Sequence, residues 1–261
     1  MEAIVSVDGS IGPAAQATIP ATDEGFLRGD GVFEVLRLYA GRIFALDDHL
    51  ARFELSARNL RLPIEIDELR ADIEAIAAHA GAVDALVRAV WTRGGHRLVF
   101  IEPIPDHSAP VRLAAVTYAP TRVMDNIKSL SYGPNMLMTR LAKERGFDEA
   151  LLVSPHGRVL EGPTSTFFWV RDGRLLTPPL TEHILPSITR ARILAATDAA
   201  EESVTLDELA GAQEAFLAST LREVQPVNAV EGMEFSLNGP RTAEAGTALR
   251  EAIETELPAA T

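Results

Sequence analysis

Short turns, rather than helices, join many of the strand-like segments of this 261-residue chain. The sequence FFWVRDGRLLT has an apolar run on each side of Asp172-Gly173, which is typical of a β-hairpin. A second hairpin is predicted over residues 3–20, where AIVSV and AAQATI flank turn residues. In a doubly wound fold the strands alternate with helices, so this order favours a mixed α+β or α/β chain that is not doubly wound.

The strongest helical periodicity lies at residues 47–60, where Asp47 can cap the start of the helix. Its apolar side chains recur at intervals of three and four residues: Leu46, Leu50, Phe53, Ala57 and Leu60. A second helix is predicted at residues 66–80. Strands are predicted at residues 85–93 and 111–118, so the first half of the chain has an α+β pattern.

The segment YAPTRVMDN breaks this pattern with Pro120 and several polar residues, which indicates a domain boundary. We therefore expect a first domain at residues 1–117, a linker at 118–125 and a second domain at 126–261. The second domain is predicted to be a β-rich barrel or sheet with helices. Its predicted elements are a helix with the apolar face Leu137, Met138, Leu141 and Ala142, strands at 149–153 and 158–161, a helix from Ser187, and a strand that ends at Ser219.

Composition excludes several classes of function. The formal net charge of −13 disfavours a nucleic-acid partner, and the chain has no cysteine for a disulfide or a thiolate metal site. Six histidines show no ligand spacing, so no metal site is expected. The chain has no signal-peptide pattern and no apolar run of ~20 residues, so we expect a cytoplasmic protein without a membrane span.

Three segments could bind an anionic group. Ser187 can cap a helix whose first backbone N–H groups, at Ile188 and Thr189, would then face a phosphate. Ser219 and Thr220 follow a strand and present hydroxyl groups. Arg52, together with His49, lies beside the apolar stripe of the first predicted helix. With Lys128 and Glu161, each isolated among small or apolar residues, these groups indicate a phosphorylated aldehyde cofactor.

The sequence resembles the class IV, or fold type IV, pyridoxal-phosphate aminotransferases. This family includes D-amino acid and branched-chain aminotransferases and aminodeoxychorismate lyases. The resemblance runs through GDGVFEVLR, HLARFELSA, TRGG, IKSLSYGPNMLMTRLAKERGFDEALL, GRVLEGPTSTFFWVRDGRLLTPPL, ILPSITRARIL and STLREVQPV. It implies a small N-terminal α/β domain and a larger barrel-like domain with helices. It also implies a homodimer whose active site lies at the domain and subunit interface.

The resemblance assigns the cofactor, pyridoxal 5′-phosphate, to particular residues. Lys128 corresponds to the Schiff-base lysine, and Glu161 to the carboxylate that pairs with the pyridine nitrogen. Tyr132 corresponds to the tyrosine beside the phenolic oxygen, although its distance from Lys128 differs by one residue from the branched-chain pattern. The phosphate group is assigned to Arg52, Ile188, Thr189 and Thr220, with Ser219 as a neighbour.

The implied reaction is a ping-pong transfer of an amino group to an α-keto acid. An amino-acid substrate needs a cation for its carboxylate, and arginine matches two oxygens best. Arg28 and Arg88 are the expected carboxylate partners, with Phe33 beside the substrate and with Arg93 and Arg97 as further candidates. Leu86 replaces the aromatic residue of the branched-chain aromatic-x-arginine motif, which favours D-amino acids, with primary (R)-amines as a further donor class.

Three alternatives stay open from the sequence. The family resemblance also includes aminodeoxychorismate lyases, which form 4-aminobenzoate and pyruvate, and branched-chain L-amino acid aminotransferases. The third alternative is that the chain has this fold but binds ligands without catalysing a reaction. The presence of both Lys128 and Glu161 argues against that third alternative.

Overall fold

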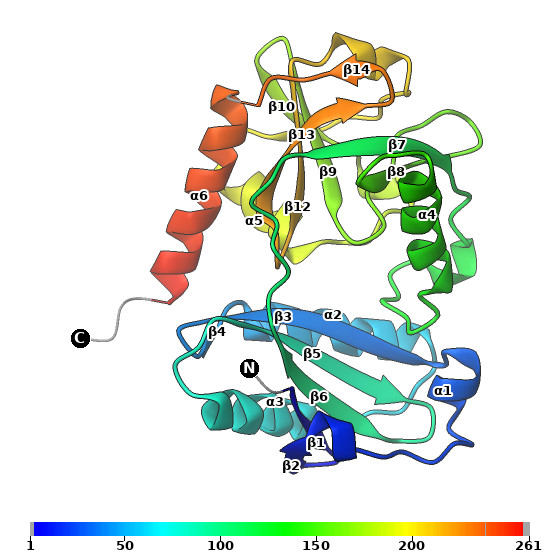
Figure 1. Ribbon diagram of the computed structural model, residues 1–261, viewed down its shortest axis with the longest axis vertical. Coiled ribbons are helices and arrows are strands. Elements are labelled where there is room, and N and C mark those ends of the chain that lie inside the picture. The colour runs from blue at the N-terminus through cyan, green and yellow to red at the C-terminus, as the bar shows by residue number, and fades with distance from the viewer. Residues whose placement is uncertain (1–2, 238, 258–261) are drawn as a thin grey trace. The chain divides into compact units, whose positions relative to one another are not determined.

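The computed structural model describes residues 3–237 and 239–257, which form two compact units (Figure 1). The first unit extends to Pro105 and includes Asn126–Tyr132, and the second contains Asp106–Asp125 and the chain from Gly133 onward. From the sequence, residues 111–117 are expected in the first domain. They lie instead in the second unit as β7 (Val111–Thr117), because this strand pairs with two strands of the second sheet.

A six-stranded sheet forms the centre of the first unit, in the order β2-β1-β6-β5-β3-β4. Every pair of neighbours in this sheet is antiparallel. Its strands are β1 (Ile4–Val7), β2 (Ser10–Pro13), β3 (Gly31–Tyr39), β4 (Arg42–Ile43), β5 (Ala85–Thr92) and β6 (Arg97–Glu102). The first predicted hairpin is therefore present and ends at Pro13. A short helix, α1 (Glu24–Arg28), precedes β3.

Two helices pack on one face of this sheet, α2 (Leu46–Asn59) and α3 (Ile66–Ala80). The apolar core between sheet and helices includes Phe53 of α2 and Leu36 of β3, both fully buried. The predicted helix at residues 66–80 is confirmed. The predicted cap at Asp47 is wrong, because α2 begins after Ala45, which has a left-handed backbone, and the Asp47 side chain pairs with Arg70 instead.

The register of β3 on β5 decides which side chains share a face of the first sheet. Phe33 lies opposite Val90, and Val35 lies opposite Arg88. Directly opposed residues point to the same face, and successive residues alternate between faces. Phe33 and Arg88 therefore share one face, and Glu34 points to the other face, which α2 covers.

An eight-stranded mixed sheet forms the centre of the second unit, with β14 paired to β13 beside the path β11-β10-β9-β12-β13-β7-β8. Besides β7, its strands are β8 (Glu149–Val153), β9 (Thr166–Arg171), β10 (Arg174–Thr177), β11 (Ala200–Glu201), β12 (Glu214–Ser219), β13 (Glu223–Val230) and β14 (Met233–Glu234). The predicted hairpin at Asp172-Gly173 joins β9 to β10. The predicted strand at residues 158–161 is only a pair of isolated bridges, from Val159 to Val153 and from Arg158 to Thr205.

Three helices belong to the second unit, α4 (Gly133–Glu144), α5 (Ile188–Ala196) and α6 (Pro240–Glu256). Helix α4 packs on β7 and β8, while α5 and α6 pack on each other and on β12 (Figure 1). Two of the four residues predicted for the apolar face of α4 are buried. Met138 and Ala142 are buried, whereas Leu137 and Leu141 are exposed.

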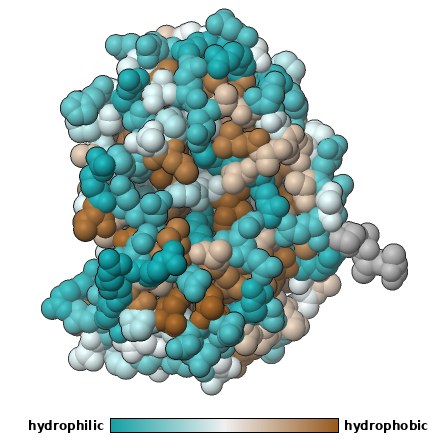
Figure 2. Space-filling view, turned by 180° about the vertical axis from the view of Figure 1, so that it is seen from behind, coloured by the Kyte–Doolittle hydropathy of each residue, from teal (hydrophilic) through white to brown (hydrophobic). Residues whose placement is uncertain are grey.

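On the face of the molecule drawn in Figure 2, hydrophilic residues predominate and hydrophobic residues occur in small groups among them. Among the described residues, no helix combines the length and the apolar character that a bilayer crossing requires.

Candidate functional site

The backbone of Lys128 is fixed beside β3 in the first unit. Its N–H group donates to the hydroxyl of Ser56 at 3.1 Å, and its carbonyl accepts from the N–H group of Phe33 at 3.0 Å. The segment around Lys128 and strand β5 both approach β3 closely at Gly31, where an added Cβ atom would lie 2.5 Å from the backbone oxygen of Trp91 and 2.6 Å from the side chain of Leu130. A glycine at the start of β3 is therefore required for this packing.

The amine of Lys128 lies over aromatic rings. Its Nζ atom is 4.5 Å from the ring centre of Phe33 and 5.8 Å from that of Tyr132. The two rings meet edge to face with their centres 5.1 Å apart. The structure thus brings together three residues that the sequence analysis selected, and it presents the amine against an apolar and aromatic surface.

Arg52 belongs to a buried cluster that Glu34 organises. The Glu34 carboxylate accepts from Nε of Arg52 at 2.6 Å, from Nη2 of Arg52 at 2.7 Å, and contacts Nδ1 of His49 at 2.8 Å. Burial lowers the pKa of His49, so its ring is neutral near pH 7. A carboxylate only accepts hydrogen bonds, so the neutral ring must carry its hydrogen on Nδ1.

Ser56 connects this cluster to Lys128. The Ser56 hydroxyl is fully buried, donates to the carbonyl of Arg52 at 2.8 Å, and accepts from the N–H group of Lys128. Glu34 and Ser56 are not among the residues predicted from the sequence. The only signal for Glu34 was one acidic residue within an otherwise apolar strand, and Ser56 had no distinguishing signal.

Glu161 lies in the second unit and is tied to the segment that leads into α5. One oxygen of its carboxylate accepts from the backbone N–H group of Leu185 at 3.1 Å. Its own carbonyl accepts from the N–H group of Leu152 in β8 at 2.8 Å. Burial and the negative charge of Glu161 raise the pKa of the Tyr118 hydroxyl. A fixed negative charge at this position suits a cationic partner.

The start of α5 has the geometry expected of an anion site. Ser187 caps the helix, because its side chain accepts from the N–H group of Arg190 at 3.2 Å. The first N–H groups of a helix have no acceptor within that helix, so those of Ile188 and Thr189 point out of its start. Both residues are buried. The predicted cap at Ser187 is confirmed.

Ser219 and Thr220 lie at the turn between β12 and β13. The Ser219 hydroxyl accepts from the backbone N–H group of Arg222 at 3.3 Å. The Arg222 side chain pairs with the buried carboxylate of Glu149 on β8. The turn is therefore fixed by the Ser219 hydroxyl and by the ion pair between Arg222 and Glu149. This ion pair is not predicted from the sequence.

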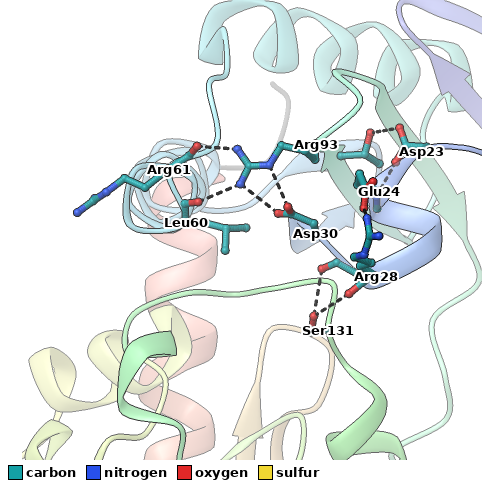
Figure 3. Close-up of polar contacts among 11 residues, drawn as sticks. Asp23, Glu24, Arg28, Asp30, Leu60, Arg61, Arg93 and Ser131 are labelled. Carbon is teal, nitrogen blue, oxygen red and sulfur yellow. Dashed lines mark hydrogen bonds and ion pairs between the residues drawn. The ribbon is translucent and has the colours of Figure 1, made fainter.

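Arg93 is committed to a structural role (Figure 3). Its Nε and Nη2 atoms donate to the carboxylate of Asp30 at 3.0 and 3.1 Å. Nη1 donates to the carbonyl of Arg61 at 2.6 Å, and Nη2 also reaches the carbonyl of Leu60 at 3.0 Å. The guanidinium group thus connects the loop after α1 to the end of α2 by hydrogen bonds.

Arg97 is occupied in a similar way. Its Nε atom donates to Asp72 of α3 at 2.8 Å, and Nη1 pairs with Glu68. Arg97 is bonded to carboxylates of α3, and Arg93 is bonded to Asp30 and to carbonyl groups at the end of α2. A substrate carboxylate would have to displace several hydrogen bonds at either arginine. Of the four arginines considered from the sequence, these two are the less suitable.

Arg28 and Arg88 each have one carboxylate partner. Arg28, at the end of α1, pairs with Glu24 on the surface, and its side chain is 70% exposed. Ser131 bonds the carbonyls of Arg28 and Gly29, which ties the end of α1 to the Lys128 segment (Figure 3). Nε of Arg88 donates to Glu102 at 2.7 Å in a half-buried pair.

Among the residues that the structure describes, no group of three or more acidic, histidine or cysteine side chains could hold a metal ion. Each unit contains its own set of candidate groups. The first contributes Lys128, its aromatic neighbours and the Arg52 cluster, and the second contributes Glu161, the start of α5 and the turn at Thr220.

Several known proteins are similar to this chain over most of its length. The model of the family described as amino-transferase class IV matches residues 31–230. The chain is 30% identical over 277 residues to a D-alanine aminotransferase from Bacillus licheniformis, covering 97% of this chain and 98% of that protein. It is 30% identical over 253 residues to a putative branched-chain-amino-acid aminotransferase from Methanocaldococcus jannaschii, covering 87% and 88%.

A further relative combines two activities of this family. The chain is 28% identical over 274 residues to a bifunctional aminodeoxychorismate lyase / D-amino acid transaminase from Mycobacterium tuberculosis, covering 92% of this chain and 93% of that protein.

Solved structures show the same fold. A fold IV transaminase, CpuTA1, from Curtobacterium pusillum superposes with a TM-score of 0.87 at 26% identity, covering 95% of this chain and 98% of that one. A hypothetical aminotransferase from Mycobacterium tuberculosis, in its PLP-bound form, gives a TM-score of 0.89 at 25% identity, covering 97% and 99%. The predicted fold class, a fold type IV enzyme of mixed α and β structure, is confirmed.

Proposed function

The chain belongs to the class IV aminotransferases, which depend on pyridoxal 5′-phosphate, and we propose that it takes its amino group from D-amino acids. Amino acids and α-keto acids are the substrates of this family. The observation that carries the proposal is the Lys128 amine over the rings of Phe33 and Tyr132, in the same unit as Arg52, which pairs with the buried carboxylate of Glu34. A D-alanine aminotransferase among the relatives supports the choice of donor.

The described residues fit the cofactor on two observations. The capped start of α5 directs backbone N–H groups outward, as a phosphate requires, and Lys128 presents a primary amine against aromatic rings, as an aldehyde requires. When bound, the cofactor supplies a ring that withdraws electrons from the substrate Cα atom. Because Lys128 and Glu161 belong to different units, the proposal requires residues of both units to act on one cofactor.

In this proposal Lys128 holds the cofactor covalently and moves a proton to and from the substrate Cα atom. The carboxylate of Glu161, oriented by the N–H group of Leu185, keeps the ring nitrogen protonated. Tyr132 donates its hydroxyl to the phenolic oxygen. The phosphate is bound by Arg52, by the N–H groups of Ile188 and Thr189, and by Thr220 with Ser219 beside it.

For the substrate carboxylate we propose Arg28 or Arg88. Arg28 has an exposed pair with Glu24 to give up, and exposed pairs of this kind stabilise a protein very little. Arg88 lies on the same face of the sheet as Phe33, which contacts the Lys128 amine. Primary (R)-amines, which carry no carboxylate, are a further donor class in this proposal.

We also propose that the enzyme is a homodimer in the cytoplasm, with the active site completed by the partner subunit near Arg28. Light scattering of the purified enzyme should give twice the mass of the chain. A monomer that is fully active would contradict the dimer.

Two other activities are compatible with the relatives. The lyase reaction is supported by similarity to the bifunctional Mycobacterium tuberculosis enzyme, and transfer from branched-chain L-amino acids by the Methanocaldococcus jannaschii protein. Leu86, which stands where the branched-chain motif has an aromatic residue, argues against the second of these.

A half-reaction screen tests the proposal. D-alanine, L-leucine and (R)-1-phenylethylamine are added separately to the loaded enzyme without a keto acid, and the cofactor absorbance near ~410–430 nm is followed. Bleaching by D-alanine at a rate well above that of L-leucine is expected. Bleaching by L-leucine alone would contradict the choice of donor, and pyruvate release from aminodeoxychorismate without a keto acid would favour the lyase.

A further inference from the structure

Glu34 is a charged carboxylate enclosed in the first unit, with only 1% of its surface exposed. It lies on the face of β3 that α2 covers, so its partners come from that helix. Nε and Nη2 of Arg52 each donate to a different oxygen of the carboxylate, at 2.6 and 2.7 Å. Nδ1 of His49 contacts the same oxygen as Nη2, at 2.8 Å.

The negative charge of Glu34 is permanent at neutral pH. Burial raises the pKa of this carboxyl, but the charge of Arg52 and the hydrogen bonds from His49 and Arg52 lower it by more. The net result is a pKa well below the usual range of a glutamate. Breaking a buried ion pair leaves an uncompensated charge, which is strongly unfavourable. Arg52 is therefore held in place continuously.

The pairing fixes the orientation of Arg52. Two parallel N–H···O bonds to one carboxylate define both the plane and the direction of a guanidinium group. The side chain of Arg52 is 12% exposed, so it is not entirely enclosed by the protein. The carbonyl of Arg52 is bonded to Ser56, which in turn accepts from Lys128. One hydrogen-bonded chain thus connects Glu34 to Arg52 and to the lysine that bears the cofactor.

We propose that Glu34 is a positioning residue for the phosphate group of the cofactor. It acts through Arg52, whose guanidinium it holds in the orientation that binds the phosphate, and it does not touch the cofactor itself. This inference rests on the proposed function, because it requires Arg52 to be a phosphate ligand. A buried pair that only stabilises the fold would affect all ligands alike, whereas a positioning residue affects the phosphate selectively.

The experiment compares two ligands of the cofactor-free enzyme, pyridoxal 5′-phosphate and pyridoxal, which lacks the phosphate. Dissociation constants are measured by absorbance titration for the wild type and for Glu34→Gln. Loss of the charged partner should weaken binding of the phosphorylated ligand by about tenfold or more, since hydrogen bonds to charged groups contribute ~1.5–3 kcal/mol. Binding of pyridoxal should change much less.

Asp72→Asn is the matched control, because Asp72 is another buried carboxylate of the first unit and pairs with Arg97 rather than Arg52. It should lower the unfolding temperature of the cofactor-free enzyme without changing the ratio of the two dissociation constants. If Glu34→Gln does not fold, Glu34→Asp replaces it. This variant keeps the charge but is too short to hold both nitrogen atoms of Arg52, so the same selective loss is expected.

Arg52→Ala separates failure of this inference from failure of the proposed function. It should weaken binding of the phosphorylated ligand selectively, and adding Glu34→Gln to it should cause no further selective loss. If Arg52→Ala is selective and Glu34→Gln is not, the positioning role of Glu34 is wrong while Arg52 remains a phosphate ligand. If Arg52→Ala is not selective, the phosphate assignment of Arg52 fails, and the role of Glu34 fails with it.

Discussion

The backbone N–H group of Lys128 donates to the side chain of Ser56, at 3.1 Å, and these two residues are far apart in the sequence. The Ser56 hydroxyl is fully buried and also donates to the carbonyl of Arg52. A single small side chain in α2 therefore determines where the backbone of Lys128 lies relative to Arg52.

Ser56→Ala should reduce both stability and activity. The substitution removes the acceptor of the Lys128 N–H group, and a hydrogen bond of this kind contributes ~0.5–1.5 kcal/mol. Urea unfolding of the cofactor-free protein measures the loss of stability, and steady-state kinetics the fall in kcat. Thr255→Ala, which removes an exposed hydroxyl bonded to a helix carbonyl in α6, is the control and should change stability much less. Equal effects of the two substitutions would contradict the role of Ser56.

Local sequence patterns predicted the elements that depend on neighbours along the chain. The helix at residues 66–80, the hairpin at Asp172-Gly173 and the cap at Ser187 are of this kind. The sequence could not predict which arginines are already paired, because Arg93 meets Asp30, and Arg222 meets Glu149, only after folding brings distant segments together. For the same reason the cluster around Glu34 was not foreseen, although Arg52 itself was selected.

Lys128→Ala should abolish transamination. The variant loses both the covalent attachment of the cofactor and the group that moves the proton, and proton transfer alone contributes ~10²–10⁴-fold to the rate. Borohydride reduction of the loaded wild type, followed by peptide mapping, should place the reduced cofactor on Lys128. Lys143→Ala in α4 is the control and should retain full activity. A label on any other residue would refute the assignment of Lys128.

Below about pH 6.5, stability should rise with pH because of His49. Burial holds the pKa of His49 below its ordinary value of 6.5, so the unfolded chain binds a proton in this range that the folded protein does not. The contribution is present above pH 6.5 and is lost as the pH falls, by up to ~1.4 kcal/mol per pH unit. Urea unfolding across this range should show a shallower dependence for His49→Gln. An unchanged slope would mean that His49 is protonated in the folded protein.

Glu149→Gln should weaken the turn that carries Ser219 and Thr220. Glu149 and Arg222 are 8% and 9% exposed, and removing one partner of a buried ion pair costs ~3–5 kcal/mol. If Thr220 contacts the phosphate, the affinity for pyridoxal 5′-phosphate should fall while that for pyridoxal is maintained. Glu231→Gln, which removes the partner of Arg145 in a more exposed pair, is the control. Similar losses in both variants would argue against a specific role for this turn.

The pair of Arg88 and Glu102 offers a test of substrate choice. Glu102 binds Nε and Nη2 of Arg88 at 2.7 and 3.3 Å, so a substrate carboxylate that approaches Arg88 must compete with a resident carboxylate. Arg88 shares a face of the sheet with Phe33, over whose ring the Lys128 amine lies. If Arg88 binds the substrate, Glu102 is expected to oppose amino acids and to tolerate amines.

Glu102→Gln should therefore raise kcat/KM for D-alanine relative to (R)-1-phenylethylamine, by about tenfold, because the charge of Arg88 is then no longer neutralised. Glu24→Gln makes the matching change at Arg28, and the two variants together identify the carboxylate partner. A rise for Glu24→Gln alone would assign the carboxylate to Arg28, since the surface pair would then be the one in competition with substrate. If neither variant changes the ratio, neither arginine receives the substrate carboxylate, and the proposal that Arg28 or Arg88 binds it is wrong.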